Sequence, residues 1–202
     1  MPRRVDKTER RNRIMDAAMR VFARLGVHQA RMDDVAREAR LSKGALYWYF
    51  RSKEDLLKAI LARMFEPDLQ LMEELVRQRE RSAVERLETL ARKALDSLPQ
   101  MRVTQALLYE FYALAARTGP LQVLIRDYYR RYYELLTELL AQGVEQGELR
   151  IQNPRRAAMA LLAQFEGLFL ISVLLPGVDL HQEWQALSQE VLKRVTGENG
   201  SF

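Results

Sequence analysis

Residues 32–50 read MDDVAREARLSKGALYWYF and contain the pattern that decides the fold. The apolar positions predict one short helix over about residues 32–39, followed by a tight turn. Ser42 is a good N-cap for a second short helix through about Tyr49. Leu46 and Phe50 stand four positions apart on that helix, so both can pack against the helices that precede it. Two short helices with this spacing form a helix-turn-helix, whose second helix enters the major groove of DNA.

The outward face of the second helix carries side chains suited to DNA. Lys43 can reach phosphate or a guanine edge, Gly44 allows the backbone close to a base, and the Ala45 methyl group can meet a thymine methyl group. Tyr47 and Trp48 can donate to phosphate oxygens while their rings pack on the DNA backbone. The alternative is a three-helix module that packs on protein. Two aromatic residues beside a lysine on a polar face favour DNA binding over packing on protein.

Charge is distributed unevenly along the 202 residues, which carry a formal net charge of +5. Residues 1–65 hold 16 Lys/Arg against 8 Asp/Glu, a net charge of +8, whereas residues 66–202 have a net charge of −3. A basic N-terminal third predicts a polyanionic partner for that third alone. The 48% apolar content is typical of a globular chain, and the absence of cysteine excludes disulfide scaffolds and thiolate metal sites.

Helical periodicity continues along the rest of the chain and predicts an all-α fold. An amphipathic helix ends at Gly26, and a longer helix begins at Ser52. Pro67 is expected to kink or break that longer helix, because proline lacks an N–H group and clashes with the preceding turn. Further helices are expected at about 68–80, 83–97, 101–117, 120–146, 154–175 and 181–196.

One segment, residues 157–175, is apolar enough to suggest a membrane span. Polar residues interrupt it, and a carboxylate such as that of Glu166 is costly in the middle of a bilayer. A helix buried in protein on most sides is therefore the preferred interpretation. No targeting segment is visible at the N-terminus, so we expect a cytoplasmic protein without membrane contact.

The segment 42–57, SKGALYWYFRSKEDLL, resembles the signature of the tetracycline-repressor (TetR) family of one-component regulators. The preceding helix, which ends in VFARLGV at residues 21–27, is similar as well, so the resemblance covers about residues 8–64. It implies a helix-turn-helix DNA-binding domain at 1–52 and a larger helical domain at 53–202 for effector binding and dimerisation. The DNA contacts that it implies are Ser42, Lys43, Gly44, Ala45, Tyr47, Trp48 and Lys53.

Two positions depart from the family pattern. Ala30 and Arg31 stand where threonine or serine usually opens the helix expected at residues 32–39. The cap of that helix is therefore lost, and Arg31 is expected to contact phosphate instead. Arg40 replaces the glycine that usually begins the turn, and a left-handed conformation there would cost about 1 kcal/mol. Both changes add positive charge where phosphates would lie.

The larger domain is rich in aromatic residues that suggest an effector pocket. Tyrosines among leucines either pack as core or line a cavity with an apolar body and a few polar groups. The resemblance implies a small effector, and an apolar lining favours a lipophilic one. The expected lining residues are Leu108, Phe111, Tyr112, Tyr128, Tyr132 and Phe165.

Charged residues of the larger domain do not decide the charge of the effector's head group. Arg126, Arg130 and Arg131 either meet an anionic group or stay solvated on an exposed helix face. Glu110 and Glu166 either face a cation or pair with arginine.

The last two expected helices carry more apolar surface than one core face needs. Gly167 would let another backbone approach closely. In the family that the chain resembles, two such helices from each subunit form a four-helix dimer interface. The expected interface residues are Leu161, Leu168, Phe169, Ser172, Trp184, Leu187 and Val191.

These features predict a repressor that binds a palindromic double-stranded operator as a homodimer, with half-sites about 34–36 Å apart or more. A small lipophilic effector is expected to release it from the DNA. In this hypothesis the effector shifts the helix that runs from Ser52 past Pro67. One alternative is a DNA-binding regulator under the control of a protein partner. An enzyme is the other, but His28 and His181 lie far apart and no metal or nucleophile motif is visible, so no catalytic residue, cofactor or metal is expected.

Overall fold

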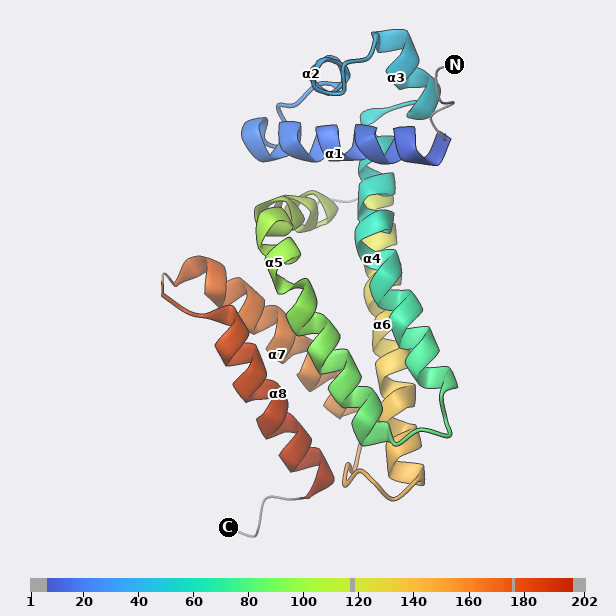
Figure 1. Ribbon diagram of the computed structural model, residues 1–202, viewed down its shortest axis with the longest axis vertical. Coiled ribbons are helices and arrows are strands. Elements are labelled where there is room, and N and C mark those ends of the chain that lie inside the picture. Colours follow the sequence, from blue (N-terminus) through green and yellow to red (C-terminus); the bar gives the residue numbers. More distant parts are fainter. Residues whose placement is uncertain (1–6, 117–118, 176, 198–202) are drawn as a thin grey trace, which may run out of the picture. The chain divides into compact units, whose positions relative to one another are not determined.

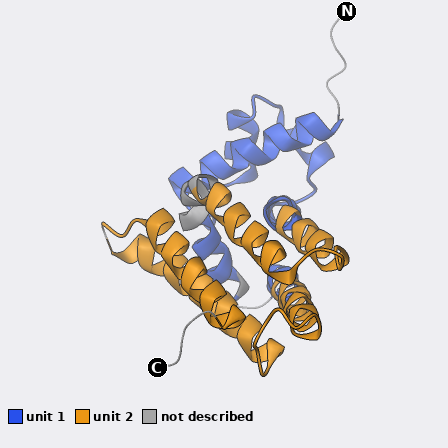
Figure 2. Ribbon diagram, turned by 60° about the horizontal axis from the view of Figure 1, so that its bottom comes forward, with its two compact units in different colours: residues 1–66, 101–127 blue, residues 67–100, 128–202 orange. Residues whose placement is uncertain are grey.

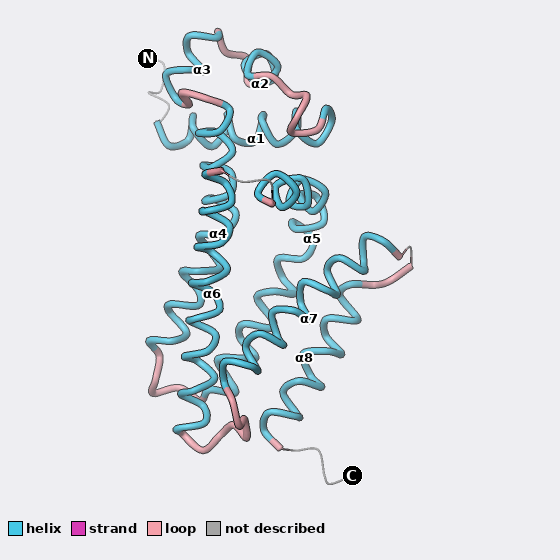
Figure 3. Tube along the Cα trace, turned by 180° about the vertical axis from the view of Figure 1, so that it is seen from behind, coloured by secondary structure: helices cyan, strands magenta, loops and turns pink. Residues whose placement is uncertain are grey.

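Eight α-helices and no strand make up the described part of the chain, and the all-α prediction is confirmed. The computed structural model describes residues 7–116, 119–175 and 177–197, with every side chain among them except those at 99–106 and 115. The expected end of a helix at residue 117 lies outside this range. The helices are α1 (Lys7–Leu25), α2 (Met32–Glu38), α3 (Lys43–Tyr49), α4 (Lys53–Arg77), α5 (Ala83–Ala115), α6 (Pro120–Glu145), α7 (Pro154–Leu174) and α8 (Leu180–Thr196) (Figures 1 and 3).

The helices belong to two compact units, which Figure 2 distinguishes by colour. Unit 1 consists of residues 1–66 and 101–127, and unit 2 consists of residues 67–100 and 128–202. In unit 1, α2 and α3 lie on the same side of α1 (Figure 1). Buried apolar side chains of this unit include Ile14, Val21, Phe22, Val35, Leu46, Phe50, Leu56 and Ile60.

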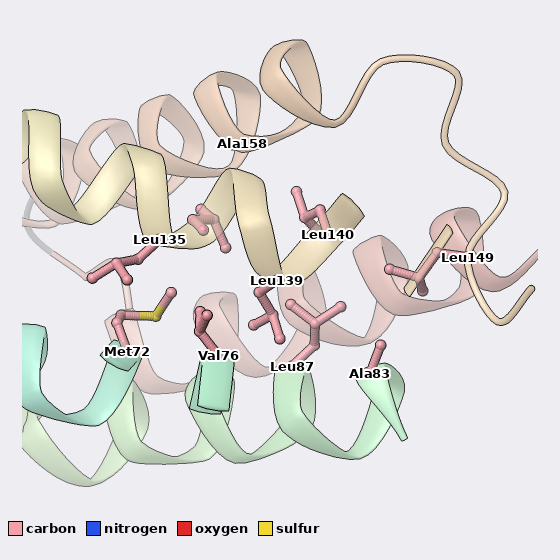
Figure 4. Packing of buried hydrophobic residues seen from close by; sticks show 10 residues of the cluster. Met72, Val76, Ala83, Leu87, Leu135, Leu139, Leu140, Leu149 and Ala158 are labelled. Carbon is pink, nitrogen blue, oxygen red and sulfur yellow. The ribbon is translucent and has the colours of Figure 1, made fainter. Parts of the chain in front are cut away.

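The core of unit 2 joins four helices. Figure 4 shows leucines of α6 between side chains of α4 and α5. Within this core Arg86 is fully buried and donates to the Leu75 carbonyl at 3.1 Å, to Gln142 Oε1 at 2.5 Å and to Gln146 Oε1 at 3.1 Å. These bonds connect α4, α5 and α6, and they satisfy a buried charge that would otherwise be costly. The core residues are Met72, Val76, Ala83, Leu87, Leu135, Leu136, Leu139, Leu140, Leu149 and Ala158.

Proline ends neither of the long helices that contain it. The prediction that Pro67 separates two helices is wrong, because α4 continues from Lys53 to Arg77. A proline inside a helix costs about 3 kcal/mol, whereas each fully buried large apolar side chain contributes about 1.5–3 kcal/mol. Phe65 before the proline and Met72 after it are both buried, so the packing of each half outweighs the lost hydrogen bond. The expected helices at 83–97 and 101–117 are likewise one helix, α5.

The prediction that the apolar helix near the C-terminus is buried on most sides is wrong for a single chain. Only 11% of the most apolar window of α7 is buried. By length and composition alone, α7 qualifies as a possible membrane span, with a mean hydropathy of 1.9 over that window. The side chains that it exposes include Met159, Leu170, Ile171, Val173 and Leu174.

Candidate functional site

The second helix of the helix-turn-helix, α3, is positioned by two buried side chains and one cap. Leu46 and Phe50 are fully buried, as the spacing predicts. The Ser42 hydroxyl oxygen accepts a hydrogen bond from the Ala45 backbone N–H at 3.2 Å, which satisfies one of the open donors at the start of the helix. Lys43, Gly44, Tyr47 and Trp48 are exposed as a result, and Ala45 is half-buried.

The turn before α3 carries the strained residue that the sequence predicts. Arg40 has a φ of 55°, and it is the one non-glycine residue with a positive φ among those described. Its backbone N–H bonds to the Arg37 carbonyl at 3.1 Å, and the N–H of Leu41 bonds to the Ala36 carbonyl at 2.9 Å. This pair of bonds is the Schellman ending of a helix, in which the left-handed position usually belongs to glycine.

The start of α2 lacks a capping oxygen, again as expected. Arg31 is the N-cap, and its side chain has no acceptor to offer. The hydrogen bond in the opposite direction is present: the Arg31 backbone N–H donates to Asp34 Oδ2 at 2.9 Å. The guanidinium group of Arg31 is therefore not needed for the cap, and the residue is exposed.

Lys43 forms an ion pair with an acidic residue of α2. Its Nζ lies 2.9 Å from Asp33 Oδ1 and 3.1 Å from Oδ2, and both side chains are more than half exposed. The hydrogen bond and charge of Asp33 raise the pKa of Lys43. Asp33 was not identified from the sequence as a partner of Lys43.

Lys53 is bound to the loop before α2. Its Nζ donates to the His28 carbonyl at 3.1 Å and to the Ala30 carbonyl at 2.8 Å. Burial lowers its pKa. An ammonium group has three N–H donors, so this anchor leaves one for a phosphate oxygen.

A hollow of about 760 Å³ lies between these side chains. It contains four of the predicted DNA-contact residues, Arg31, Lys43, Tyr47 and Lys53. The remaining lining residues are His28, Gln29, Ala30, Met32 and Asp33, none of which the sequence singled out as a DNA contact. Three cations at one hollow suit a phosphate backbone.

The N-terminus of α1 extends this basic surface. Lys7 Nζ lies 4.9 Å from the centre of the Trp48 ring, at a distance typical of a cation–π contact. Arg11 lies over the Phe50 ring at 4.4 Å and donates to the Tyr49 carbonyl at 3.4 Å. The excess positive charge of the N-terminal third was the signal for these residues, but charge alone did not single them out.

The predicted pocket residues fall in both units. In unit 1, Leu108 and Phe111 are buried, and Tyr112 stacks edge-on against Tyr109 with ring centres 6.1 Å apart. In unit 2, the Tyr128 and Tyr132 rings lie 5.9 Å apart.

Phe165 packs with two residues predicted for the dimer interface. Its ring stacks on Phe169 at 6.3 Å and meets Trp184 edge-on at 4.9 Å. Trp184 Nε1 donates to the Ala91 carbonyl at 3.0 Å, and Phe169 is buried within the chain. The other predicted interface residues, Leu161, Leu168, Ser172, Leu187 and Val191, are half-buried. In the described part of the chain no group of three or more His, Asp or Glu residues is placed to hold a metal ion.

Comparison with known proteins finds matching families for two parts of the chain. Residues 14–60 match the family described as bacterial regulatory proteins, tetR family, and residues 83–197 match the one described as BetI-type transcriptional repressor, C-terminal. The HTH-type transcriptional regulator SrpR of Pseudomonas putida is 30% identical over 161 residues, which cover 79% of this chain and 71% of that protein.

Two solved structures have a similar fold. The transcriptional regulator FadR from Bacillus subtilis, crystallised in complex with stearoyl-CoA, has a TM-score of 0.75 at 22% identity and covers 91% of this chain and 98% of its own. SmeT, the repressor of the Stenotrophomonas maltophilia multidrug efflux pump SmeDEF, has a TM-score of 0.77 at 23% identity, with 94% of this chain and 91% of its own covered.

Proposed function

The chain belongs to the TetR family of bacterial regulatory proteins and is a DNA-binding helix-turn-helix transcriptional regulator, and we propose that it is a repressor whose homodimer binds a palindromic operator. A small lipophilic effector releases the dimer from the DNA. Residues 1–52 bind DNA, residues 53–202 bind the effector and the second copy, and the protein acts in the cytoplasm. The proposal assigns no catalytic step to the chain.

The arrangement of α3 is the observation that carries the proposal. Buried Leu46 and Phe50 hold the helix against the rest of unit 1, so its opposite face is exposed. That face presents Lys43, Tyr47 and Trp48 beside the basic hollow. A short helix with exposed cationic and aromatic side chains is suited to the major groove and its flanking phosphates.

The exposed apolar face of α7 supports the homodimer. Large contiguous apolar surface on a soluble chain marks a contact with a partner. α8 packs beside α7 (Figures 1 and 3). Among the described residues, no atom outside the adjoining α7 backbone and chain neighbours lies within 4 Å of a Cβ placed on Gly167, which leaves room for a helix of a second copy. A two-fold dimer would bring two α3 helices to the two halves of a palindrome.

Three hydrogen bonds to one loop, made by two side chains, support release by an effector. The loop between α1 and α2 is held by Lys53 at the start of α4 and by Glu110 of α5, whose Oε2 accepts from the Val27 backbone N–H at 2.5 Å. A shift of either helix would move this loop, which leads directly into α2 and α3. The stearoyl-CoA complex of the FadR relative supports a small molecule as the trigger. An effector shifts the equilibrium only if it binds the two states with different affinity.

A binding experiment with a matched pair of lysine variants tests the proposal. Double-stranded fragments that the protein selects from a random pool would supply the operator, and fluorescence anisotropy against random competitor would measure its affinity. Lys43→Ala is expected to weaken operator binding by about tenfold, since a good base or phosphate contact contributes about 1–3 kcal/mol. Lys93→Ala removes another exposed lysine, on α5, and is expected to change little. Selection of no palindrome above random competitor, or equal losses in both variants, would overturn the proposal.

A further inference from the structure

The turn between α2 and α3 holds an arginine in a backbone conformation that suits glycine. Arg40 has a φ of 55°, and no other non-glycine residue of the described ranges has a positive φ. Two hydrogen bonds close the turn, from the N–H groups of Arg40 and Leu41 to the carbonyls of Arg37 and Ala36, and both use backbone atoms alone. Glycine would make the same bonds without strain, so the fold itself does not account for an arginine at this position.

The guanidinium group of Arg40 has no partner within the part of the chain that the structure describes. The residue is exposed, and no described acceptor or carboxylate bonds to its side chain. Other arginines of unit 1 do have such partners, since Arg20 lies 2.9 Å from Glu38 and Arg37 lies 3.8 Å from Asp34. The charge of Arg40 is therefore available to a partner that binds this surface.

The dipole of α2 does not explain the arginine either. A cation near the C-terminal end of a helix is favourable, but the effect is weak at an exposed position and is screened by salt. α2 has only seven residues, and Arg37 already supplies a cation in its last turn. A second cation for the dipole would not need a residue in a left-handed conformation.

The other end of α2 shows the same combination. Arg31 is the N-cap, where serine, threonine, asparagine or aspartate would accept a backbone hydrogen bond, and its side chain makes no cap bond. It is exposed, and no residue among those described bonds to its guanidinium group. At both ends of α2, therefore, an unpaired arginine stands where another residue would stabilise the backbone better. This points to one anionic partner that both arginines meet.

The position of Arg40 along the chain identifies where that partner would lie. The residue stands two positions before Ser42, the N-cap of α3. In a helix-turn-helix, the N-terminal residues of the second helix contact the edges of the bases in the major groove. The phosphates that border the groove are then the anions nearest to the turn. A guanidinium group suits them, because it can donate two parallel hydrogen bonds to one phosphate.

We propose that Arg40 binds a phosphate of the DNA backbone beside the N-terminal end of α3, and that the strained backbone at this turn serves this contact. Contacts with phosphates position a protein on DNA without reading its sequence. The inference rests on the proposed operator binding and adds to it a contact that glycine, the usual residue at this turn, cannot make.

Four substitutions at this position separate charge from backbone strain. Arg40→Gly, Arg40→Asn and Arg40→Ala all remove the charge, but glycine and asparagine tolerate the left-handed conformation better than alanine does. Arg40→Lys keeps the charge. Fluorescence anisotropy at several salt concentrations between about 0.05 and 0.2 M would measure the affinity of each full-length protein for its selected duplex and for a random duplex.

The three neutral variants are expected to lose DNA affinity alike, although their stabilities differ. Removal of one phosphate contact reduces the slope of log affinity against log salt by about one per bound subunit, and weakens binding at least about fivefold near 0.1 M salt. The loss should be the same on the selected and the random duplex, because a phosphate contact is independent of sequence. Arg40→Lys should keep the original slope.

Arg20→Gln is the matched control. It removes one exposed positive charge of unit 1 that is already bound to Glu38, and it is expected to leave the salt slope nearly unchanged. Thermal melts of every variant verify folding. The inference is overturned by an unchanged slope in a folded Arg40→Asn protein or by a loss in Arg40→Ala alone, which would reflect the backbone. A loss confined to the selected duplex would indicate a base contact instead, and would overturn it as well.

The same measurements distinguish this inference from the proposed function. If the preferred duplex is not a palindrome, the proposed homodimer on a palindromic operator fails, and the Arg40 variants on that duplex still decide the phosphate contact. If the protein selects a palindrome and Arg40→Asn binds it with the original affinity and salt slope, the proposed function stands and the inference about Arg40 fails.

Discussion

Replacement of Arg40 by glycine is expected to stabilise the protein. Arg40 has a φ of 55°, in the left-handed region where a side chain clashes with its own backbone. The residue is exposed, and its backbone N–H bond to Arg37 does not depend on the side chain. Arg40→Gly therefore removes the strain and keeps the Schellman ending of α2.

The expected gain follows from two opposing contributions. The left-handed conformation costs a residue with a Cβ about 1–2 kcal/mol, whereas glycine adds about 0.4–1 kcal/mol of conformational entropy to the unfolded chain. The free energy of unfolding should rise by about 0.5–1 kcal/mol, which for a chain of this length raises Tm by about 1–4 °C. Urea unfolding and calorimetry at one fixed protein concentration measure both quantities, since association would otherwise contribute.

Two arginine variants distinguish strain from charge. Arg40→Ala removes the same charge but keeps a Cβ at positive φ, so its stability should stay within about 0.5 kcal/mol of the original. Arg37→Gly places glycine inside α2 three residues earlier and should cost about 1 kcal/mol. If Arg40→Gly were no more stable than Arg40→Ala, the backbone at this turn would not be strained and the argument would be refuted.

Three further predictions concern other parts of the chain. A Cβ on Gly143 would lie 2.6 Å from Leu149 Cγ and 2.8 Å from Ala83 Cβ, so Gly143→Ala should lower the free energy of unfolding by about 1–2 kcal/mol in a urea titration. Gly44 has open space around it, so Gly44→Ala should raise the free energy of unfolding in the same titration. Lys53→Ala should weaken operator binding and reduce the slope of log affinity against log salt by about one, because it removes one phosphate-facing cation and frees the loop before α2. Burial raises the pKa of Glu166, so between about pH 4.5 and the raised pKa the folded state keeps a proton that the unfolded chain has lost. The free energy of unfolding should therefore fall as pH rises through this range. Glu166→Gln should flatten that part of a Tm–pH profile.

Local signals in the sequence sufficed for the helix-turn-helix. Ser42 caps α3, and Gly26 ends α1 with a φ of 75°. The spacing of Leu46 and Phe50 identified the buried face of α3 correctly. Each of these features depends on residues within one or two turns of each other, which is the range over which a single sequence is informative.

Features that depend on distant residues were not predictable. The partners of Lys43 and Lys53 lie 10 to 25 positions away, so their hydrogen bonds follow only from the packed structure. Gly143 in the sequence is simply a weak helix former, and its contacts with Ala83 and Leu149 explain it only afterwards. At Pro67 the local rule predicted a kink or a break, and the helix does not break because tertiary packing on both sides stabilises it.

Two lysines of the N-terminal third, Lys43 and Lys53, differ in how easily they could move to contact DNA. Lys43 is paired with Asp33, but both side chains are more than half exposed, and such a surface pair contributes at most about 1 kcal/mol. It can exchange its carboxylate partner for a phosphate at little cost. Lys53 is half-buried and bound to two carbonyl oxygens, so its release would leave backbone acceptors without their donor. Equal formal charges therefore imply different expected roles. Lys43 would be free to move to a phosphate of bound DNA, whereas Lys53 holds the loop before α2 in place.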